Sequence, residues 1–179
     1  MNDSFFIYLH RLELIAFFSG YPLVYAAVHL IAGKPHNRNE WRKTIVSLLS
    51  YSYALVATLY LGFEMKSLYP DYSIENLKQF TTHPFLVAWG LLALLFWFAF
   101  FAKRPALTLA HSLVFFFLLI NDLFFSEAVS SADKSLIRND MELYTSSILL
   151  NIVSFTIVAL ICFLYRRFKL SWKSSRLLQ

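Results

Sequence analysis

The sequence is poor in the residues from which covalent and metal sites are built. Its 179 residues include one cysteine, Cys162, so an internal disulfide and a site made of several thiolates are both excluded. There are only 4 glycines and no glycine-rich phosphate-binding loop. No catalytic triad, pair of catalytic carboxylates or metal motif of known spacing is present. The sequence therefore favours a protein without catalytic activity, and it indicates no particular class of enzyme.

Charge is also scarce, and it is unevenly distributed. Charged residues make up 15% of the chain and apolar residues 58%, with a mean hydropathy of +0.55. This composition is too apolar for an ordinary soluble domain. The net charge of +5 is compatible with nucleic-acid binding, but the basic residues lie in short segments beside apolar runs. Membrane topology explains that pattern better, so we expect an integral membrane protein that binds no nucleic acid.

The apolar runs predict an all-α integral membrane protein with five transmembrane helices in a single domain, 1–179. Residues 84–102 and 105–125 are runs of about 20 residues, which at ~1.5 Å per residue span the ~30 Å core of a bilayer. Lys103 and Arg104 separate them and predict a transmembrane hairpin. The chain start lacks a basic region, so we expect the first run to be an anchor rather than a cleaved signal. The remaining predicted helices cover about residues 5–32, 44–68 and 143–165.

Local signals refine these helices. Pro22 predicts a kink near Phe18, and Gly20 would let a neighbouring helix approach closely. The second predicted helix is rich in hydroxyl side chains, so we expect protein to surround it. Between the second and third helices, Ser73 is expected to cap a short interfacial helix that ends at Phe80.

The basic residues predict the orientation. They gather in the loop 34–43, in the hairpin turn 103–104 and in the tail 166–179, where Glu40 is the only acid. By the positive-inside rule these three segments are cytoplasmic, with the N-terminus outside and the C-terminus inside. The short loops and this asymmetry favour a bacterial inner membrane. We expect the basic tail to bind anionic lipids at the membrane surface.

Two histidines lie inside the predicted spans. His29 and His111 are roughly 7 and 10 Å from the cytoplasmic boundary at 1.5 Å per residue. If the first and fourth helices touch, the pair could ligate one b-type haem or relay a proton. Alternatively, each imidazole bonds a neighbouring hydroxyl or carbonyl. Gly20 and Gly90 lie nearer the outer half, which counts against a porphyrin edge beside these histidines.

Other polar residues form two further candidate sets. The first is an outer rim, interpreted either as solvated ion pairs or as an ion entry point. Its main members are Glu13, Glu64, Asn121 and Asp122. In the second set, Asn151 and Ser154 share a face of the fifth helix, which predicts either a hydrogen-bonded bundle interior or a substrate path.

These patterns favour a non-catalytic accessory subunit of a larger membrane complex for transport, energy coupling or a motor. Its partners would be other integral membrane subunits, and the phenylalanine-rich runs 96–101 and 114–118 are expected to face lipid or those subunits. One alternative is an electron-transfer subunit that binds haem b or conducts protons through His29 and His111. Another is a small transporter that uses the hydroxyls of the second helix and the outer acids.

Overall fold

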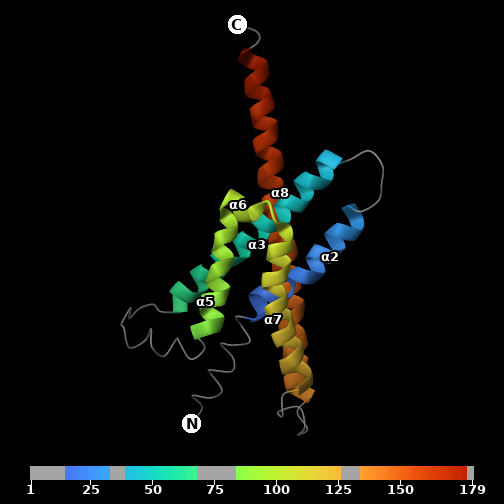
Figure 1. The fold of residues 1–179 in the computed structure, drawn as a ribbon, viewed down its shortest axis with the longest axis vertical. Helices are drawn as coiled ribbons and strands as arrows, with labels where there is room; N and C mark the ends of the chain where they lie inside the picture. Colours follow the sequence, from blue (N-terminus) through green and yellow to red (C-terminus); the bar gives the residue numbers. More distant parts are fainter. Residues whose placement is uncertain (1–14, 33–38, 68–83, 126–133, 177–179) are drawn as a thin grey trace.

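A computed structural model describes residues 15–32, 39–67, 84–125 and 134–176, and within these ranges every regular element is helical (Figure 1). The predicted all-helical class is thus confirmed. The first apolar helix, Ile15–Ile31, turns at Gly20. The labelled elements are α2 (Tyr21–Ala32), α3 (Asn39–Ser67), α5 (Pro84–Leu92), the 3-10 helix η1 (Ala93–Trp97), α6 (Ala99–Ala102), α7 (Pro105–Phe125) and α8 (Lys134–Arg176).

Successive helices alternate in direction, as a polytopic bundle requires. In Figure 1, α2 rises, α3 descends, the segment from α5 to α6 rises, α7 descends and α8 rises. The predicted hairpin turn is present between α6 and α7. The N–H of Lys103 donates to the Ala99 carbonyl at 3.3 Å and that of Arg104 to the Phe101 carbonyl at 3.0 Å. Pro105 then begins α7, where its fixed φ suits the first turn.

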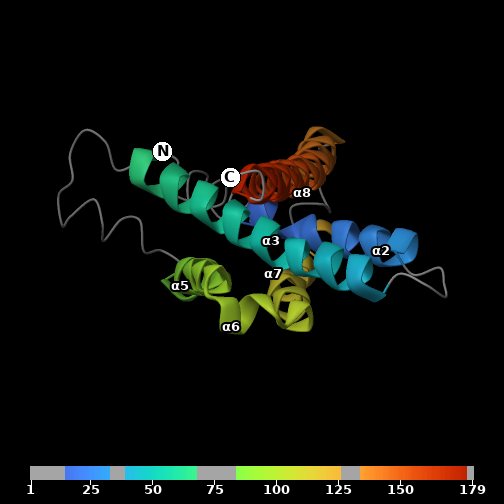
Figure 2. The same ribbon diagram turned by 90° about the horizontal axis from the view of Figure 1, so that it is seen from above.

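Helix α3 is the centre of the molecule. Seen from above, it crosses between α2 and α8 on one side and α5, α6 and α7 on the other, and it contacts all of them (Figure 2). Tyr53 and Ala57 on this helix are fully buried. The Thr58 hydroxyl donates to the Ala54 carbonyl at 2.9 Å, which satisfies a polar group without water. The expectation that protein surrounds this helix holds for one face of it, whereas Thr58, Leu59 and Met65 are exposed.

Two helices of the described part are long and apolar enough to cross a bilayer. They are Thr44–Lys66 within α3 and Met141–Lys169 within α8. The other apolar helices, Ile15–Ile31, Pro84–Trp97 and Pro105–Asn121, are shorter. By length and composition, five full membrane spans are therefore not confirmed.

The third predicted helix, 84–102, is not continuous. It passes from α5 into η1, and the chain is extended at Phe98 (φ −74°, ψ 131°) before α6 begins. The backbone stays satisfied, because the N–H of Phe98 donates to the Leu95 carbonyl and its carbonyl accepts from Phe101, both at 3.0 Å. Aromatic side chains lose rotamer freedom in a helix, which makes this aromatic-rich segment a weak helix former.

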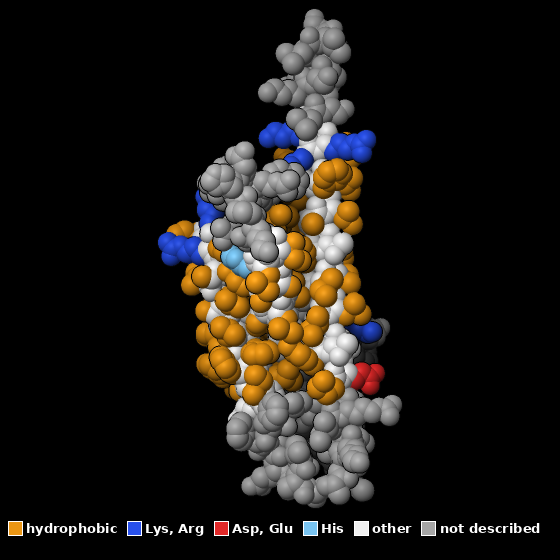
Figure 3. Space-filling model, turned by 90° about the vertical axis from the view of Figure 1, so that its right-hand side faces the viewer, with side chains coloured by type: hydrophobic (Ala, Val, Ile, Leu, Met, Phe, Trp, Pro, Cys, Tyr) orange, Lys and Arg blue, Asp and Glu red, His pale blue; other side chains and the backbone are white. Residues whose placement is uncertain are grey.

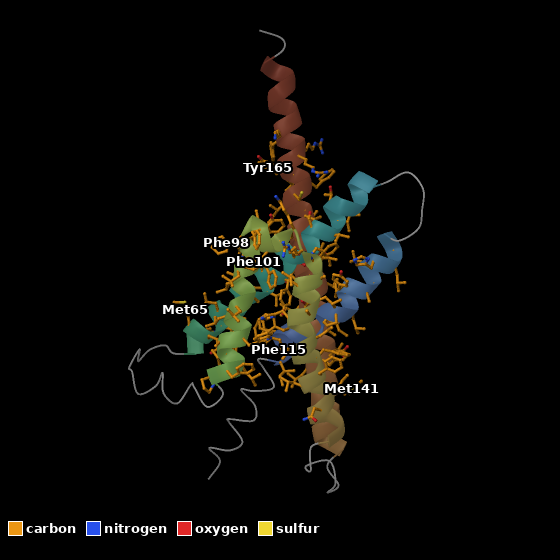
Figure 4. All side chains as sticks on the ribbon, in the orientation of Figure 1. Met65, Phe98, Phe101, Phe115, Met141 and Tyr165 are labelled. Carbon is orange, nitrogen blue, oxygen red and sulfur yellow. The ribbon has the colours of Figure 1, made fainter. Side chains whose placement is uncertain are left out.

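The phenylalanine-rich runs divide between the core and the surface. Phe96 is buried against Tyr53, with ring centroids 5.7 Å apart, whereas Phe98 is 63% exposed (Figure 4). On α7, Phe115 is fully buried and Phe117 is exposed. The expectation that these runs face outward is wrong for Phe96 and Phe115, because helical geometry turns neighbouring rings to opposite sides.

Helix α8 extends beyond the predicted range 143–165 at both ends. Residues 134–176 contain no glycine or proline, so nothing in the sequence interrupts the helix. Residues 134–142, which precede the predicted range, and the first part of the basic tail are consequently helical, and α8 rises past the other helices (Figure 1). The predicted interfacial helix 73–80 and residues 5–14 of the first predicted helix lie outside the described residues.

Candidate functional site

His111, on α7, joins three helical segments through both of its ring nitrogens. The imidazole is buried, with Nδ1 2.7 Å from the Tyr53 hydroxyl of α3 and Nε2 2.7 Å from the Trp89 carbonyl of α5. A carbonyl only accepts, so Nε2 carries the proton and the Tyr53 hydroxyl donates to Nδ1 of a neutral ring. His111 thereby fixes α3, α5 and α7 relative to one another.

Aromatic rings enclose this imidazole. The Trp89 indole is stacked on it, with centroids 4.9 Å apart and an interplanar angle of 3°, and its N–H donates to the His111 carbonyl at 3.3 Å. The Phe96 and Phe115 rings lie 6.0 and 5.8 Å from the imidazole. We call Tyr53, Trp89, Phe96, His111 and Phe115 the His111 cluster.

A second hydrogen-bonded tie joins α2 to α7. The Tyr21 hydroxyl lies 2.8 Å from Thr108 Oγ1, which itself donates to the Pro105 carbonyl at 2.6 Å. The single proton of Thr108 is used in that second bond, so Tyr21 donates to Thr108. The hydrogen bonds from Tyr21 through Thr108 and from Tyr53 through His111 both end at a backbone carbonyl. A carbonyl passes no proton onward, so both arrangements hold helices together.

His29 lies at the far end of an aromatic row. Its ring is 4.7 Å from Tyr25, Tyr25 is 6.1 Å from Tyr21, and Tyr21 is 4.4 Å from Tyr53, which meets His111 at 5.6 Å. Three tyrosines thus separate the two histidines along this row. Because both nitrogens of His111 are engaged, a haem ligated by this pair would require the Tyr53 or Trp89 bond to break.

An apolar cleft of about 390 Å³ opens beside the His111 cluster. Its lining comes from α5 and η1 on one side and from α6 and α7 on the other. The lining residues are Trp89, Leu92, Leu95, Phe96, Phe101, Leu107, Ala110, His111 and Val114. The ring nitrogens of His111 and the indole N–H of Trp89 are already hydrogen-bonded. The cleft therefore offers hydrocarbon contacts.

The first apolar helix meets α8 at unusually short range. A Cβ added to Gly20 would lie 2.6 Å from the backbone N of Ile148, and the Gly20 N–H donates to Ser147 Oγ at 2.8 Å. Asn151 Nδ2 donates to the carbonyls of Phe17 and Ser147, at 3.1 and 2.9 Å. The predicted close approach at Gly20 is confirmed, and Asn151 lies in the bundle interior.

The predicted outer-rim residues lie in different surroundings. Glu64 is buried on α3, one turn after the buried Tyr60, whereas Asn121 is exposed near the end of α7. Asp122 is within α7, but its side chain lies outside the described part, as does the whole of Glu13. No rim site can be assembled from Glu64 and Asn121.

Sequence reasoning missed the roles of Trp89 and Ser147. Ser147 could have been found, since it lies four residues before Asn151 on the same helix face. The position of Trp89 depends on how α5 and α7 pair, which no spacing along the chain reveals. Within the described ranges, no group of three or more His, Cys, Asp or Glu side chains could hold a metal ion.

Comparison of the chain with protein-family models, with curated proteins and with solved structures finds no match. Its function must therefore be inferred from its own residues.

Proposed function

We propose that this chain is an integral membrane protein that crosses a bacterial inner membrane five times. The observation that carries the proposal is that, of the two membrane-length apolar spans in the described residues, the more apolar one is also the more exposed. The apolar window within Met141–Lys169 is 17% buried, whereas the less apolar Thr44–Lys66 is 44% buried. Water would oppose this arrangement, and a hydrocarbon environment favours it.

The surface pattern supports a membrane location. Large exposed apolar side chains follow α8 along its upper half; they include Leu160, Ile161, Phe163, Leu164 and Phe168. Figure 3 shows a broad apolar surface with most of the visible Lys and Arg side chains toward the C-terminal end, and with one basic and one acidic patch near the opposite end. Single exposed leucines are ordinary on soluble proteins, but a continuous patch of this kind marks contact with lipid or with another protein.

The proposed orientation has the basic end in the cytoplasm. Arg166 Nη2 donates to Thr44 Oγ1 at 3.2 Å, so the start of α3 and the end of the apolar part of α8 are level with each other. The turn at Lys103 and Arg104 lies toward the same end in Figure 1. The loop 34–43, this turn and the tail then share the side that the positive-inside rule assigns to the cytoplasm.

Within the membrane, we propose the role of a non-catalytic subunit of a larger assembly. The interior polar groups of the His111 cluster are used to hold helices together. The broad outer face of α8, by contrast, is free to pack against helices of other subunits. Flat apolar helix faces associate in bilayers through close packing.

Photo-crosslinking in native membranes tests the subunit role. A crosslinking amino acid is placed at Ile161 on α8 and, as a matched control, at Phe117 on α7; both side chains are 62% exposed. We expect discrete protein adducts from Ile161 and mainly lipid adducts from Phe117. Lipid adducts alone at both positions would contradict the subunit role while leaving the membrane location intact.

The second candidate is haem-linked electron transfer through His29 and His111, which requires one of the two hydrogen bonds of the His111 ring to break. An absorption spectrum of protein purified from haem-supplied cells tests it. A Soret band that disappears in His111→Ala would establish this candidate in place of the subunit role. A preparation without a Soret band would remove it.

A further inference from the structure

We propose that the cleft beside the His111 cluster holds one acyl chain of an anionic phospholipid, whose phosphate group is bound by Lys103 and Arg104. This inference rests on the proposed membrane location. It adds a specific lipid site at the hairpin between α6 and α7, away from the basic tail.

The chemistry of the cleft selects a hydrocarbon chain. Its polar lining atoms are already paired, since His111 binds Tyr53 and the Trp89 carbonyl, and the Trp89 indole binds the His111 carbonyl. A ligand that needs hydrogen bonds would find none there. The volume of about 390 Å³ lies within the range of small-molecule sites, ~300–1,000 Å³.

The cleft is open on the side where lipid would be. Leu92, Leu95 and Leu107 line it and are 45%, 39% and 41% exposed. An acyl chain could therefore enter sideways from the bilayer and cover these three side chains. No helix of the described part covers them.

Two basic residues next to the cleft favour a lipid with an anionic headgroup. Lys103 and Arg104 lie between Phe101 and Leu107, which both line the cleft, and both cations are exposed. The Arg104 guanidinium lies 5.0 Å from the centroid of the exposed Phe100 ring, so a cation–π contact holds it at the hairpin turn, next to the lining residue Phe101. Residues 84–121 contain no Asp or Glu, and Asp122 comes near the far end of α7, so no acid close to the turn along this hairpin offsets the two charges.

The test measures lipid retention by native mass spectrometry of the full chain in mild detergent. The probes are phosphatidylglycerol and phosphatidylcholine with identical acyl chains. We expect one retained phosphatidylglycerol and weaker phosphatidylcholine binding. Affinity for phosphatidylglycerol should fall roughly 30-fold in the double variant Lys103→Gln and Arg104→Gln, because each cation at an anionic headgroup contributes about fivefold.

Three further variants distinguish binding at this site from general lipid binding. Ala110→Phe fills the cleft and should displace the lipid, whereas Ala106→Phe changes an exposed alanine of the same helix outside the lining and should not. The double variant Arg167→Gln and Lys169→Gln removes two exposed cations from α8 and should retain the lipid. Equal retention of both lipids, or loss of lipid only with the α8 cations, would overturn the proposed site. A chain found outside the membrane fraction would instead refute the proposed function.

Discussion

At the scale of single residues, two buried polar side chains, His111 and Thr108, link helices through hydrogen bonds. His111 bonds one partner on α3 and another on α5, and Thr108 links α2 to the start of α7. A buried polar group without a partner is costly, so each tie favours one arrangement of the helices over others. This explains why an imidazole lies among phenylalanines without an exposed nitrogen.

The contribution of the hydrogen bond between Tyr53 and His111 to stability can be measured by substitution. Tyr53→Phe leaves Nδ1 of His111 buried without a donor, so the free energy of unfolding in detergent should fall by about 1–3 kcal/mol. Tyr51→Phe on the same helix is the matched control, because no hydrogen bond of the Tyr51 hydroxyl is seen within the described ranges. Its effect should stay within about 0.5 kcal/mol. Equal losses in both variants would show that the Tyr53–His111 bond contributes little.

At the scale of elements, close backbone approach matters as much as apolar burial. The helix that turns at Gly20 reaches the backbone of α8 at Ser147 and Ile148, and Asn151 bonds the carbonyl of Phe17 across this contact. Small residues let two helix backbones meet, and side-chain hydrogen bonds then become possible between them. This contact fixes α8 along the bundle.

Two glycines provide a direct comparison at this scale. In Gly20→Ala the new Cβ would meet backbone atoms of Ser147 and Ile148 at 2.6 Å, and these atoms cannot rotate away. Overpacking of this kind should lower the free energy of unfolding by about 1–3 kcal/mol. Gly62→Ala places its Cβ in open space within α3 and should raise stability by about 0.5–1 kcal/mol. Denaturant titration of both variants in micelles measures the difference, and a neutral Gly20→Ala would contradict the close contact.

At the scale of the whole molecule, the distribution of apolar side chains between α3 and α8 is the reverse of that in a soluble protein. The hydroxyl-rich α3 lies in the centre, and the more apolar α8 lies outside and extends beyond it (Figures 1 and 2). Such a molecule suits a solvent that is itself apolar.

Cysteine labelling tests the proposed orientation. In a Cys162→Ala background, Lys66→Cys and Lys103→Cys place single thiols at two exposed positions. A membrane-impermeant maleimide should label Lys66→Cys in intact cells and Lys103→Cys only after permeabilisation, because the proposed orientation places the basic hairpin turn on the cytoplasmic side. The reverse pattern would refute the orientation, and labelling of both positions in intact cells would refute the separation of the two ends by a membrane.

The sequence by itself determined the helical class, the hairpin turn at Lys103–Arg104 and the central environment of α3. Apolar runs, prolines and hydroxyl content are local properties, and they act over one helix at a time. The small size of Gly20 indicated a close helix contact, and the spacing of Asn151 and Ser154 indicated either a bundle interior or a substrate path. The lengths of the apolar helices were less well predicted, because the composition did not indicate the break at the extended Phe98, whose N–H and carbonyl are satisfied by Leu95 and Phe101.

Only the tertiary structure decided which side chains meet. The pairing of α3, α5 and α7 brought Tyr53 and Trp89 to His111 and separated His111 from His29 by a row of tyrosines. It also buried Phe96 and Phe115 and opened the cleft between η1 and α7. These features depend on helix crossing and rotation, which are set by contacts between residues far apart in the chain.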